Sequence, residues 1–212
     1  MYLGAFTPYI YDNSGYDNRG IIVGTLKKSS DSPRYQSYTD FPDASSYFYF
    51  PHIVASDTMQ NELTLATWIK RTYTDAVNRH YFYGAINAYI YSNFNFRIGW
   101  DAAIADGTYS SNTWDPGVNL PLNEWHHIVF TFKNGTFTCY LDGEYIGTSP
   151  RNPYIRGYRG TAASIGYTHI GGISDFRLYS TCLTAEQVKE LYNTSAAIDN
   201  QGNIHTREVV EL

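Results

Sequence analysis

The sequence is poor in charged residues and has no long apolar run. Charged residues make up 17% of the 212 residues, the formal net charge is −5, and Lys and Arg form no block. Nucleic-acid binding needs clustered cations, so composition argues against that class and against an anionic membrane as partner. No run of about 18 apolar residues occurs, and the opening MYLGAFTPYI lacks the basic and apolar regions of a signal peptide. We expect a soluble protein with no signal peptide and no membrane insertion.

Cysteine is also scarce. Cys139 and Cys182 are the only two, so the chain can form at most one disulfide. Such sparse usage favours two buried thiols over a disulfide, and Cys139 is predicted to point into the core.

Aromatic residues are abundant instead. The chain has 21 tyrosines and 11 phenylalanines and is 43% hydrophobic, which favours strands and is enough for a sizeable core. The length fits a single all-β domain. We place that domain at residues 1–195, and residues 196–212 form a tail that either folds back as a hairpin or stays mobile.

The stretch 125–147, WHHIVFTFKNGTFTCYLDGEYIG, gives the clearest structural signal. Asn134-Gly135 and Asp142-Gly143 are type I′ turn dipeptides, and they predict three adjacent antiparallel strands. Counting outward from these turns predicts the pairs Lys133–Thr136, Phe132–Phe137, Phe130–Cys139, Ile128–Leu141, Leu141–Glu144 and Cys139–Ile146. The apolar partners then share one face of the sheet.

Further strands are predicted by alternating or aromatic runs between turn residues. They lie at residues 21–26, 35–41, 47–51, 63–70, 79–91, 95–100, 162–165 and 172–179. Apolar side chains on both sides of the segment 63–70 indicate a strand covered on both faces. Polar or breaker-rich loops are expected at 27–34, 101–124 and 150–161.

One helix is predicted, at residues 184–193. Thr184 and Gln187 form a capping box, and Val188, Leu191 and Tyr192 share one face. Many short strands with one short helix favour an all-β, two-sheet antiparallel sandwich. A closed barrel is the alternative, and we prefer the sandwich because several strands are apolar on both faces.

Several stretches resemble one known family. They are DNSGYDNRG at 12–20, FPDASSYFYFP at 41–51, LTLATWIK at 63–70, the double hairpin at 125–147, and GISDFRLYSTCLTAEQVKELYN at 172–193. Together they resemble the laminin G-like, concanavalin A-like jelly-roll domain, although Pro42-Asp43 stands where that family usually has Asp-Gly. DSPRY at 31–35 and AIDNQGNIHTREVVEL at 197–212 are similar to the versions found in bacteriophage structural proteins. The resemblance implies a module that recognises carbohydrate or protein, since only some relatives are glycanases.

The chain lacks the acidic pattern of the catalytic relatives. Those enzymes carry Glu-x-Asp-x-Glu on one strand, and no such motif occurs here. Asp142 and Glu144 flank a turn and are expected to be turn and solvated residues. Adjacent strand residues such as His126 and His127 point to opposite faces, so one is expected to pack and the other to be exposed. We therefore expect no enzymatic activity.

Calcium is the one cofactor that the resemblance brings in, because domains of this kind sometimes hold it with loop carboxylates. The candidate ligands are Asp12, Asp40, Asp43 and Asp175. The alternative is structural: Asp12 and Asp43 suit turns, and Asp175 can pair with Arg177.

The tyrosines are the best candidates for ligand binding, since Tyr offers a flat face and a hydroxyl for stacking on sugars or docking a partner. Cross-strand packing is the alternative role for such residues. The loops at 101–124 and 150–161 are the expected binding rims. The candidate ligand-binding residues are Tyr89, Trp100, Tyr109, Trp114, Tyr154, Arg156 and Tyr158.

From these observations we expect a non-catalytic recognition or display module on the surface of a phage virion. Its partners would be host-surface carbohydrate or another host receptor, and other virion proteins. The alternative is a purely structural decoration or fibre-tip domain that makes protein–protein contacts without specific sugar binding.

Overall fold

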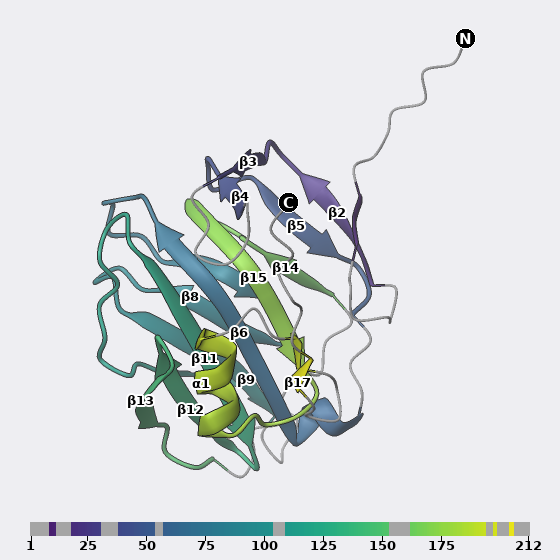
Figure 1. The fold of residues 1–212 in the computed structure, drawn as a ribbon, viewed down its shortest axis with the longest axis vertical. Coiled ribbons are helices and arrows are strands. Elements are labelled where there is room, and N and C mark those ends of the chain that lie inside the picture. Colours follow the sequence, from purple (N-terminus) through teal and green to yellow (C-terminus); the bar gives the residue numbers. More distant parts are fainter. Residues whose placement is uncertain are drawn as a thin grey trace.

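Two antiparallel sheets face each other across an aromatic core (Figure 1). The computed structural model describes residues 9–11, 18–30, 38–53, 57–103, 109–152, 162–193, 197–198 and 204–205. The expected two-sheet antiparallel sandwich is confirmed, and strands distant in sequence are neighbours in both sheets.

Sheet A has eight strands. In spatial order they are β1 (Tyr9–Tyr11), β2 (Arg19–Val23), β5 (Tyr47–Phe50), β14 (Ala163–Ile165), β7 (Arg79–Tyr83), β8 (Ile86–Ile90), β9 (Phe96–Ala103) and β10 (Tyr109–Trp114).

Sheet B has seven strands. In spatial order they are β13 (Glu144–Thr148), β12 (Thr136–Leu141), β11 (Trp125–Lys133), β6 (Glu62–Arg71), β15 (Gly171–Tyr179), β4 (Tyr38–Phe41) and β3 (Lys27–Ser29). A short 3-10 helix, η1 (Asp57–Gln60), precedes β6.

Aromatic rings from the two sheets meet in the core. Phe96 of β9 packs on Phe130 of β11 with ring centroids 6.0 Å apart, and Trp100 of β9 stacks on Phe137 of β12 at 4.9 Å. All four side chains are at most 5% exposed. Burying a side chain such as Phe contributes about 1.5–3 kcal/mol, so these inter-sheet contacts account for much of what holds the layers together.

The double hairpin has the predicted register at its first turn and departs from it at the second. All the predicted β11–β12 pairs occur, from Lys133–Thr136 to Ile128–Leu141, and Leu141 pairs with Glu144. The turn residues Asn134 and Asp142 have φ of 48° and 52°, as a type I′ turn requires. The predicted Cys139–Ile146 pair is wrong, because a bulge shifts the register and Cys139 pairs with Gly147.

Strand β6 lies at the centre of sheet B and is covered on both faces, as predicted. Leu63, Leu65 and Ile69 point into the sandwich, and Ala66 belongs to a second apolar cluster on the other face.

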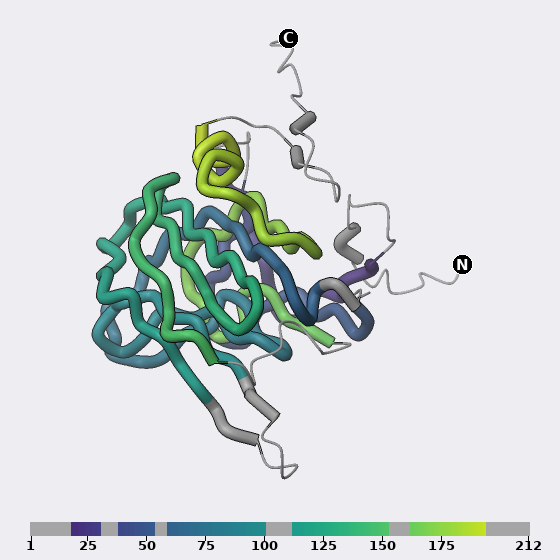
Figure 2. Tube along the Cα trace, turned by 90° about the horizontal axis from the view of Figure 1, so that it is seen from below, coloured from purple at the N-terminus to yellow at the C-terminus, as the bar shows by residue number. Residues whose placement is uncertain are grey.

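Helix α1 (Ala185–Asn193) covers that second face. Its Val188 and Leu191 join the second cluster, and the ring of Tyr192 stacks on Trp68 of β6 at 5.5 Å. The capping box is present: the Thr184 amide donates to Oε1 of Gln187, and the Gln187 amide donates to the Thr184 hydroxyl. Figure 2 shows the helix lying outside the two layers. The helix therefore closes the outer face of sheet B.

Three predicted segments are divided differently in the structure. The single segment 79–91 is the β7–β8 hairpin, because Gly84 and Ala85 turn the chain. The segment 101–124 was expected to be a loop, but β9 extends to Ala103 and β10 pairs with it. The expected loop at 27–34 contains the edge strand β3. Short polar strands such as these depend on pairing with a neighbouring strand, which the local sequence does not encode.

Both cysteines are free thiols, as favoured by the sequence. Cys139 is buried in the core, and burial raises the pKa of its thiol well above the usual value. Cys182 is half-buried, and burial is also the main reason that its pKa is raised.

In the tail, β16 (Ala197–Ile198) pairs with β17 (Ile204–His205), so this part forms an antiparallel pair. The domain boundary at residue 195 stays a prediction. Within the described ranges, no helix is long and apolar enough to cross a membrane.

Candidate ligand-binding site

The outer face of sheet A carries a row of aromatic side chains. In β5, Phe48 and Phe50 point into the core, so the alternating residues Tyr47 and Tyr49 point outward. The same alternation leaves Tyr83 of β7 outward, next to the core residue Phe82. Tyr49 and Tyr83 are 37% and 45% exposed, so both present their rings to solvent.

We call this set the tyrosine platform. Its members are Tyr47, Tyr49, His80, Tyr83, Tyr89, Tyr91 and Tyr167.

Ring-to-ring contacts link the platform across several strands. Tyr167, which follows β14, lies 5.4 Å from Tyr47 and 4.9 Å from Tyr83 between ring centroids. His80 lies 5.3 Å from Tyr83 and 5.0 Å from Tyr89. These spacings are typical of interacting aromatic pairs, so the rings hold one another in place and form a preorganised surface.

A half-buried ion pair ends the platform on the β9 side. Tyr91 lies 6.4 Å from Tyr89, and the guanidinium of Arg97 sits 3.5 Å above the Tyr91 ring. Arg97 also bonds Asp115, with Nη2 at 2.8 Å and Nε at 2.9 Å. Burial opposes the charge of Asp115, but hydrogen bonds from the Gly117 amide and from Asn95 and Arg97 outweigh it and lower the pKa of the carboxyl. The cation at this end is therefore neutralised.

The imidazole of His80 lies at the centre of the platform, between Tyr83 and Tyr89. Burial lowers the pKa of its imidazole, so the ring is neutral at pH 7. Gly99 makes room for the neighbouring Tyr89, because a side chain there would start 3.3 Å from Cε1 of that ring.

The predicted aromatic site residues have different surroundings. Trp100 is 5% exposed and stacks on Phe137 in the core, so it does not reach the surface as a ligand contact would require. Trp114 is half-buried and packs over Gly147 of β13. Tyr89 is 7% exposed and lies in the platform, between His80 and Tyr91. The backbone of Tyr109 opens β10. The remaining predicted residues, Tyr154, Arg156 and Tyr158, lie outside the described residues.

The candidate calcium ligands are spread apart. Asp175 forms a two-point ion pair with Arg177, at 2.6 and 2.8 Å, which is the pairing that the sequence offered as the structural alternative. Asp43 caps its own turn by accepting hydrogen bonds from the amide of Ser45 and the hydroxyls of Ser45 and Ser46.

Asp40 lies in β4 between Lys27 and Gly172, and Asp12 lies outside the described residues. Among the described side chains, no group of three or more His, Cys, Asp or Glu residues is arranged to hold a metal ion.

The histidine pair and the turn carboxylates also have structural partners. Asp142 accepts hydrogen bonds from Nδ1 of His126 and from the His127 amide, both at 2.8 Å, and so ties the turn to β11. Glu144 pairs with Lys189 of α1. His127 is buried under Tyr192, whereas His126 keeps 17% of its side chain exposed, so the two rings point apart as predicted.

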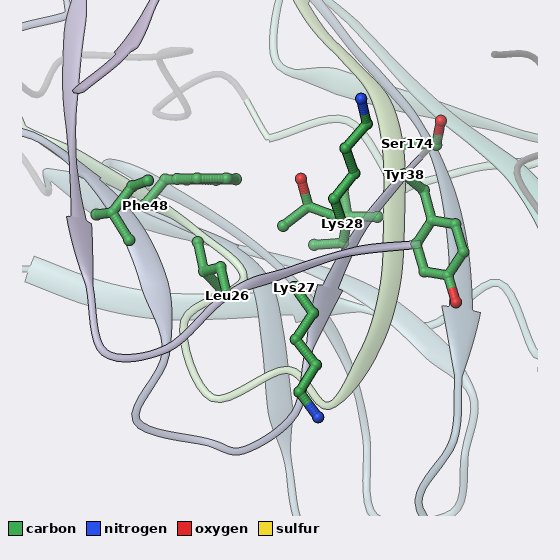
Figure 3. Close-up of a pocket in the computed structure, with 9 residues that line it drawn as sticks. Leu26, Lys27, Lys28, Tyr38, Phe48 and Ser174 are labelled. Atoms are coloured by element: carbon green, nitrogen blue, oxygen red, sulfur yellow. The ribbon is translucent and has the colours of Figure 1, made fainter. Parts of the chain in front are cut away.

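A groove of about 360 Å³ lies at the other edge of the sandwich, beside β3 (Figure 3). Ile22, Leu26 and Phe48 form its apolar part, and all three belong to the core or pack on it. Figure 3 shows the amines of Lys27 and Lys28 pointing in opposite directions. They therefore do not converge on one anion, and exposed lysines on an edge strand commonly prevent unwanted strand pairing.

The sequence reasoning missed most of the exposed members of the platform. The candidates named from the sequence did not include Tyr47, Tyr49, Tyr83 or Tyr167. The signal was present in the run Tyr-Phe-Tyr-Phe at 47–50, because strict alternation puts both tyrosines on one face and both phenylalanines on the other.

Comparisons with known proteins agree with this architecture. A laminin G-type family model described as the concanavalin A-like lectin/glucanases superfamily matches residues 42–189. A search of curated proteins found no match.

Solved structures with the same fold include binding domains of clostridial toxins. The receptor-binding domain of botulinum neurotoxin C/D mosaic serotype is 16% identical, with a TM-score of 0.67 and 86% of this chain covered. The binding domain of Paraclostridial Mosquitocidal Protein 1 is 12% identical, with a TM-score of 0.69 and 86% covered. The binding domain of botulinum neurotoxin DC, solved in complex with rat synaptotagmin II, is 15% identical, with a TM-score of 0.69 and 92% covered.

This chain covers 48%, 49% and 52% of those three chains, so it spans about half of their length. Identities this low show a shared fold and nothing more specific.

Proposed function

This chain belongs to the concanavalin A-like lectin/glucanases superfamily, and we propose that it is a non-catalytic recognition module that binds carbohydrate through the tyrosine platform. The observation that carries the proposal is the row of outward-facing rings on sheet A. Ring contacts join Tyr47, Tyr167 and Tyr83, and Tyr49 and Tyr83 are 37% and 45% exposed.

The chemistry of the platform fits sugars. A sugar ring presents C–H groups on its faces and hydroxyls at its edge, and a tyrosine offers a flat apolar face with a hydroxyl that donates and accepts. Because neighbouring rings already fix one another, little side-chain entropy is lost on binding. The opposite sheet has its outer face covered by α1, which leaves sheet A as the broad face for a ligand.

The surroundings of the carboxylates support a non-catalytic role. Glycoside hydrolysis needs two carboxyl groups facing each other across the bond that is cleaved. Among the described residues, Asp115, Asp142 and Asp175 are each engaged by Arg or His side chains. For Asp115 and Asp142, hydrogen bonds lower the pKa of the carboxyl, so these two groups are ionised and hold no proton for a leaving group.

The similar solved structures add support for recognition as a class of function. All three are described as binding or receptor-binding domains, and one was solved with the protein synaptotagmin II. A protein receptor is therefore a further type of partner to test.

We place the module on a phage virion, facing the host, on the strength of the sequence resemblance at 31–35 and 197–212. Host-surface carbohydrate would then be its ligand, and other virion proteins would hold it in place. Tyr109, Tyr154, Arg156 and Tyr158 remain proposed ligand contacts on the binding rims.

A structural role is the second candidate. Tyr89 is only 7% exposed, so part of the platform serves packing rather than contact with a ligand. In this alternative the domain decorates a virion or a fibre tip and makes only protein–protein contacts.

A glycan array probed with the labelled protein separates the two candidates. Carbohydrate recognition predicts selective binding to a group of related glycans. If no glycan is retained while the protein associates tightly with a capsid or tail protein, the carbohydrate proposal is wrong and the structural role is favoured.

A further inference from the structure

We propose that the platform contains one specific subsite, formed by Tyr49, Ser164 and Tyr83, that takes a single uncharged sugar ring. This inference rests on the proposed function and goes beyond it by naming the position and the chemical class of the bound group.

The register of three neighbouring strands creates the subsite. Ser164 of β14 pairs with Tyr49 of β5 on one side and with Tyr83 of β7 on the other. Ala163 and Ile165 point into the core, so Ser164 points to the same outer face as the two tyrosines. A short side chain therefore stands between two long aromatic ones.

The width of the subsite fits one ring. Neighbouring strands are about 4.8 Å apart, so Tyr49 and Tyr83 are separated by about 9–10 Å at their backbones. A ring stacked between two walls needs two van der Waals separations, together about 7–8 Å. The backbone separation is therefore enough for one sugar ring between the two tyrosines and too small for two.

The floor of the subsite offers a hydroxyl. Ser164 is 7% exposed, and its side chain makes no hydrogen bond to the described residues. Its hydroxyl oxygen is not among the fully buried polar atoms without a partner, so it is open to solvent, and a ligand hydroxyl can replace solvent as its partner with a modest net gain in free energy. Sugar hydroxyls both donate and accept, and so do those of Ser164, Tyr49 and Tyr83.

The charges nearby favour a neutral sugar over an acidic one. Arg97 is paired with Asp115, and Arg79 is paired with Asp75. His80 is neutral at pH 7 because burial lowers the pKa of its imidazole. None of these three groups supplies an unpaired positive charge to compensate for the lost hydration of a carboxylate or sulfate.

The test compares two substitutions that introduce the same side chain. Ser164→Leu fills the space between the tyrosines, whereas Thr113→Leu adds the same side chain at an exposed position on the same face, in β10. Binding of neutral oligosaccharides and of uronate- or sulfate-bearing ones is measured by calorimetry, and circular dichroism checks the fold. The native protein and Thr113→Leu are expected to bind the same neutral oligosaccharide, and Ser164→Leu is expected to bind it at least about tenfold more weakly, because a steric block is built into the subsite.

Ser164→Ala provides a second variant that cannot clash with its neighbours. It removes only the hydroxyl and is expected to weaken binding of the neutral oligosaccharide by about two- to tenfold, the effect of one neutral hydrogen bond.

The outcomes separate this inference from the function beneath it. If Ser164→Leu binds the neutral oligosaccharide as well as the native protein does, the subsite is wrong while carbohydrate binding stands. If only the acidic oligosaccharides bind, the assignment of an uncharged ring is wrong. If the native protein binds neither class, the proposed function itself fails, and the inference fails with it.

Discussion

Gly166, at the end of β14, shows how closely one residue can be restricted. It has a φ of +80°, and a Cβ there would lie 2.1 Å from the ring of the core residue Phe41. We expect Gly166→Ala to lower the free energy of unfolding by about 2–4 kcal/mol, about 1 from the backbone conformation and the rest from the forced shift of the ring. Urea denaturation measures this change.

Gly117 is the matched control, because its φ is +81° but nothing lies within 4 Å of the position of its Cβ. Gly117→Ala should lower the free energy of unfolding only through its strained backbone conformation, by about 1 kcal/mol. Equal losses in the two variants would contradict the close contact with Phe41.

His169 is fully buried beside Phe41 and Tyr73. Burial is the main reason that its pKa falls to about 3. Below its usual pKa of about 6.5, the unfolded chain binds a proton that the folded chain excludes. Stability is therefore complete above that pH and falls as the pH drops, by up to about 1.4 kcal/mol per pH unit for this one group.

The measurement is the free energy of unfolding between pH 6.5 and pH 5, above the range where carboxylates titrate. His80, whose pKa is also lowered by burial, adds to the slope in the same direction. The slope of the free energy of unfolding against pH reports the protons taken up on unfolding, and His169→Gln should lower that number by about one. An unchanged slope would show that His169 takes up a proton while folded.

At the scale of the elements, helix α1 depends on its cap. The hydroxyl of Thr184 accepts from the amide of Gln187 at 3.3 Å. Thr184→Ala should lower the free energy of unfolding by about 1 kcal/mol, as measured by urea denaturation. Thr184→Ser keeps the hydroxyl and should stay close to the native protein, so a similar loss in both variants would mean that the cap contributes little.

Most elements could be predicted because each has a local signal. Turn dipeptides fixed the pairing at the first turn of the double hairpin, and the capping box located the start of α1. The bulge in β13 had no such signal: it puts Gly147 opposite Cys139 and beside the ring of Trp114, which belongs to the other sheet. Strands β3 and β10 were missed for the same reason, since partners distant in sequence determine them.

At the scale of the whole molecule, the packing of the two sheets determines which aromatic residues are available for binding. Composition indicated a tyrosine-rich surface, but it could not tell Trp100, which stacks in the core, from Tyr83, which is 45% exposed. That distinction depends on which face of sheet A points to solvent, and the packing of the two sheets decides this. The alternation at residues 47–50 was the one local pattern that marked the outer face.

Metal dependence is also a property of the whole molecule. Asp43 and Asp175 are held by hydrogen bonds within the protein, so a calcium ion would have to displace existing partners. We expect the melting midpoint to be the same with calcium and with a chelator. A midpoint that rises with calcium would instead indicate a site that recruits Asp12 or Asp40.

The most direct test of the central claim is the dissociation constant of a glycan selected on the array, measured for the native protein, Tyr83→Ala and Tyr145→Ala. Tyr145 is 60% exposed and lies on sheet B, so it controls for the loss of any surface tyrosine. Tyr83→Ala loses a stacking contact, so its binding free energy should be weaker by roughly 1–2 kcal/mol, which is about five- to thirtyfold in affinity. Tyr145→Ala should bind as the native protein does. Unchanged binding by Tyr83→Ala, or an equal loss in both variants, would contradict a binding site on the tyrosine platform.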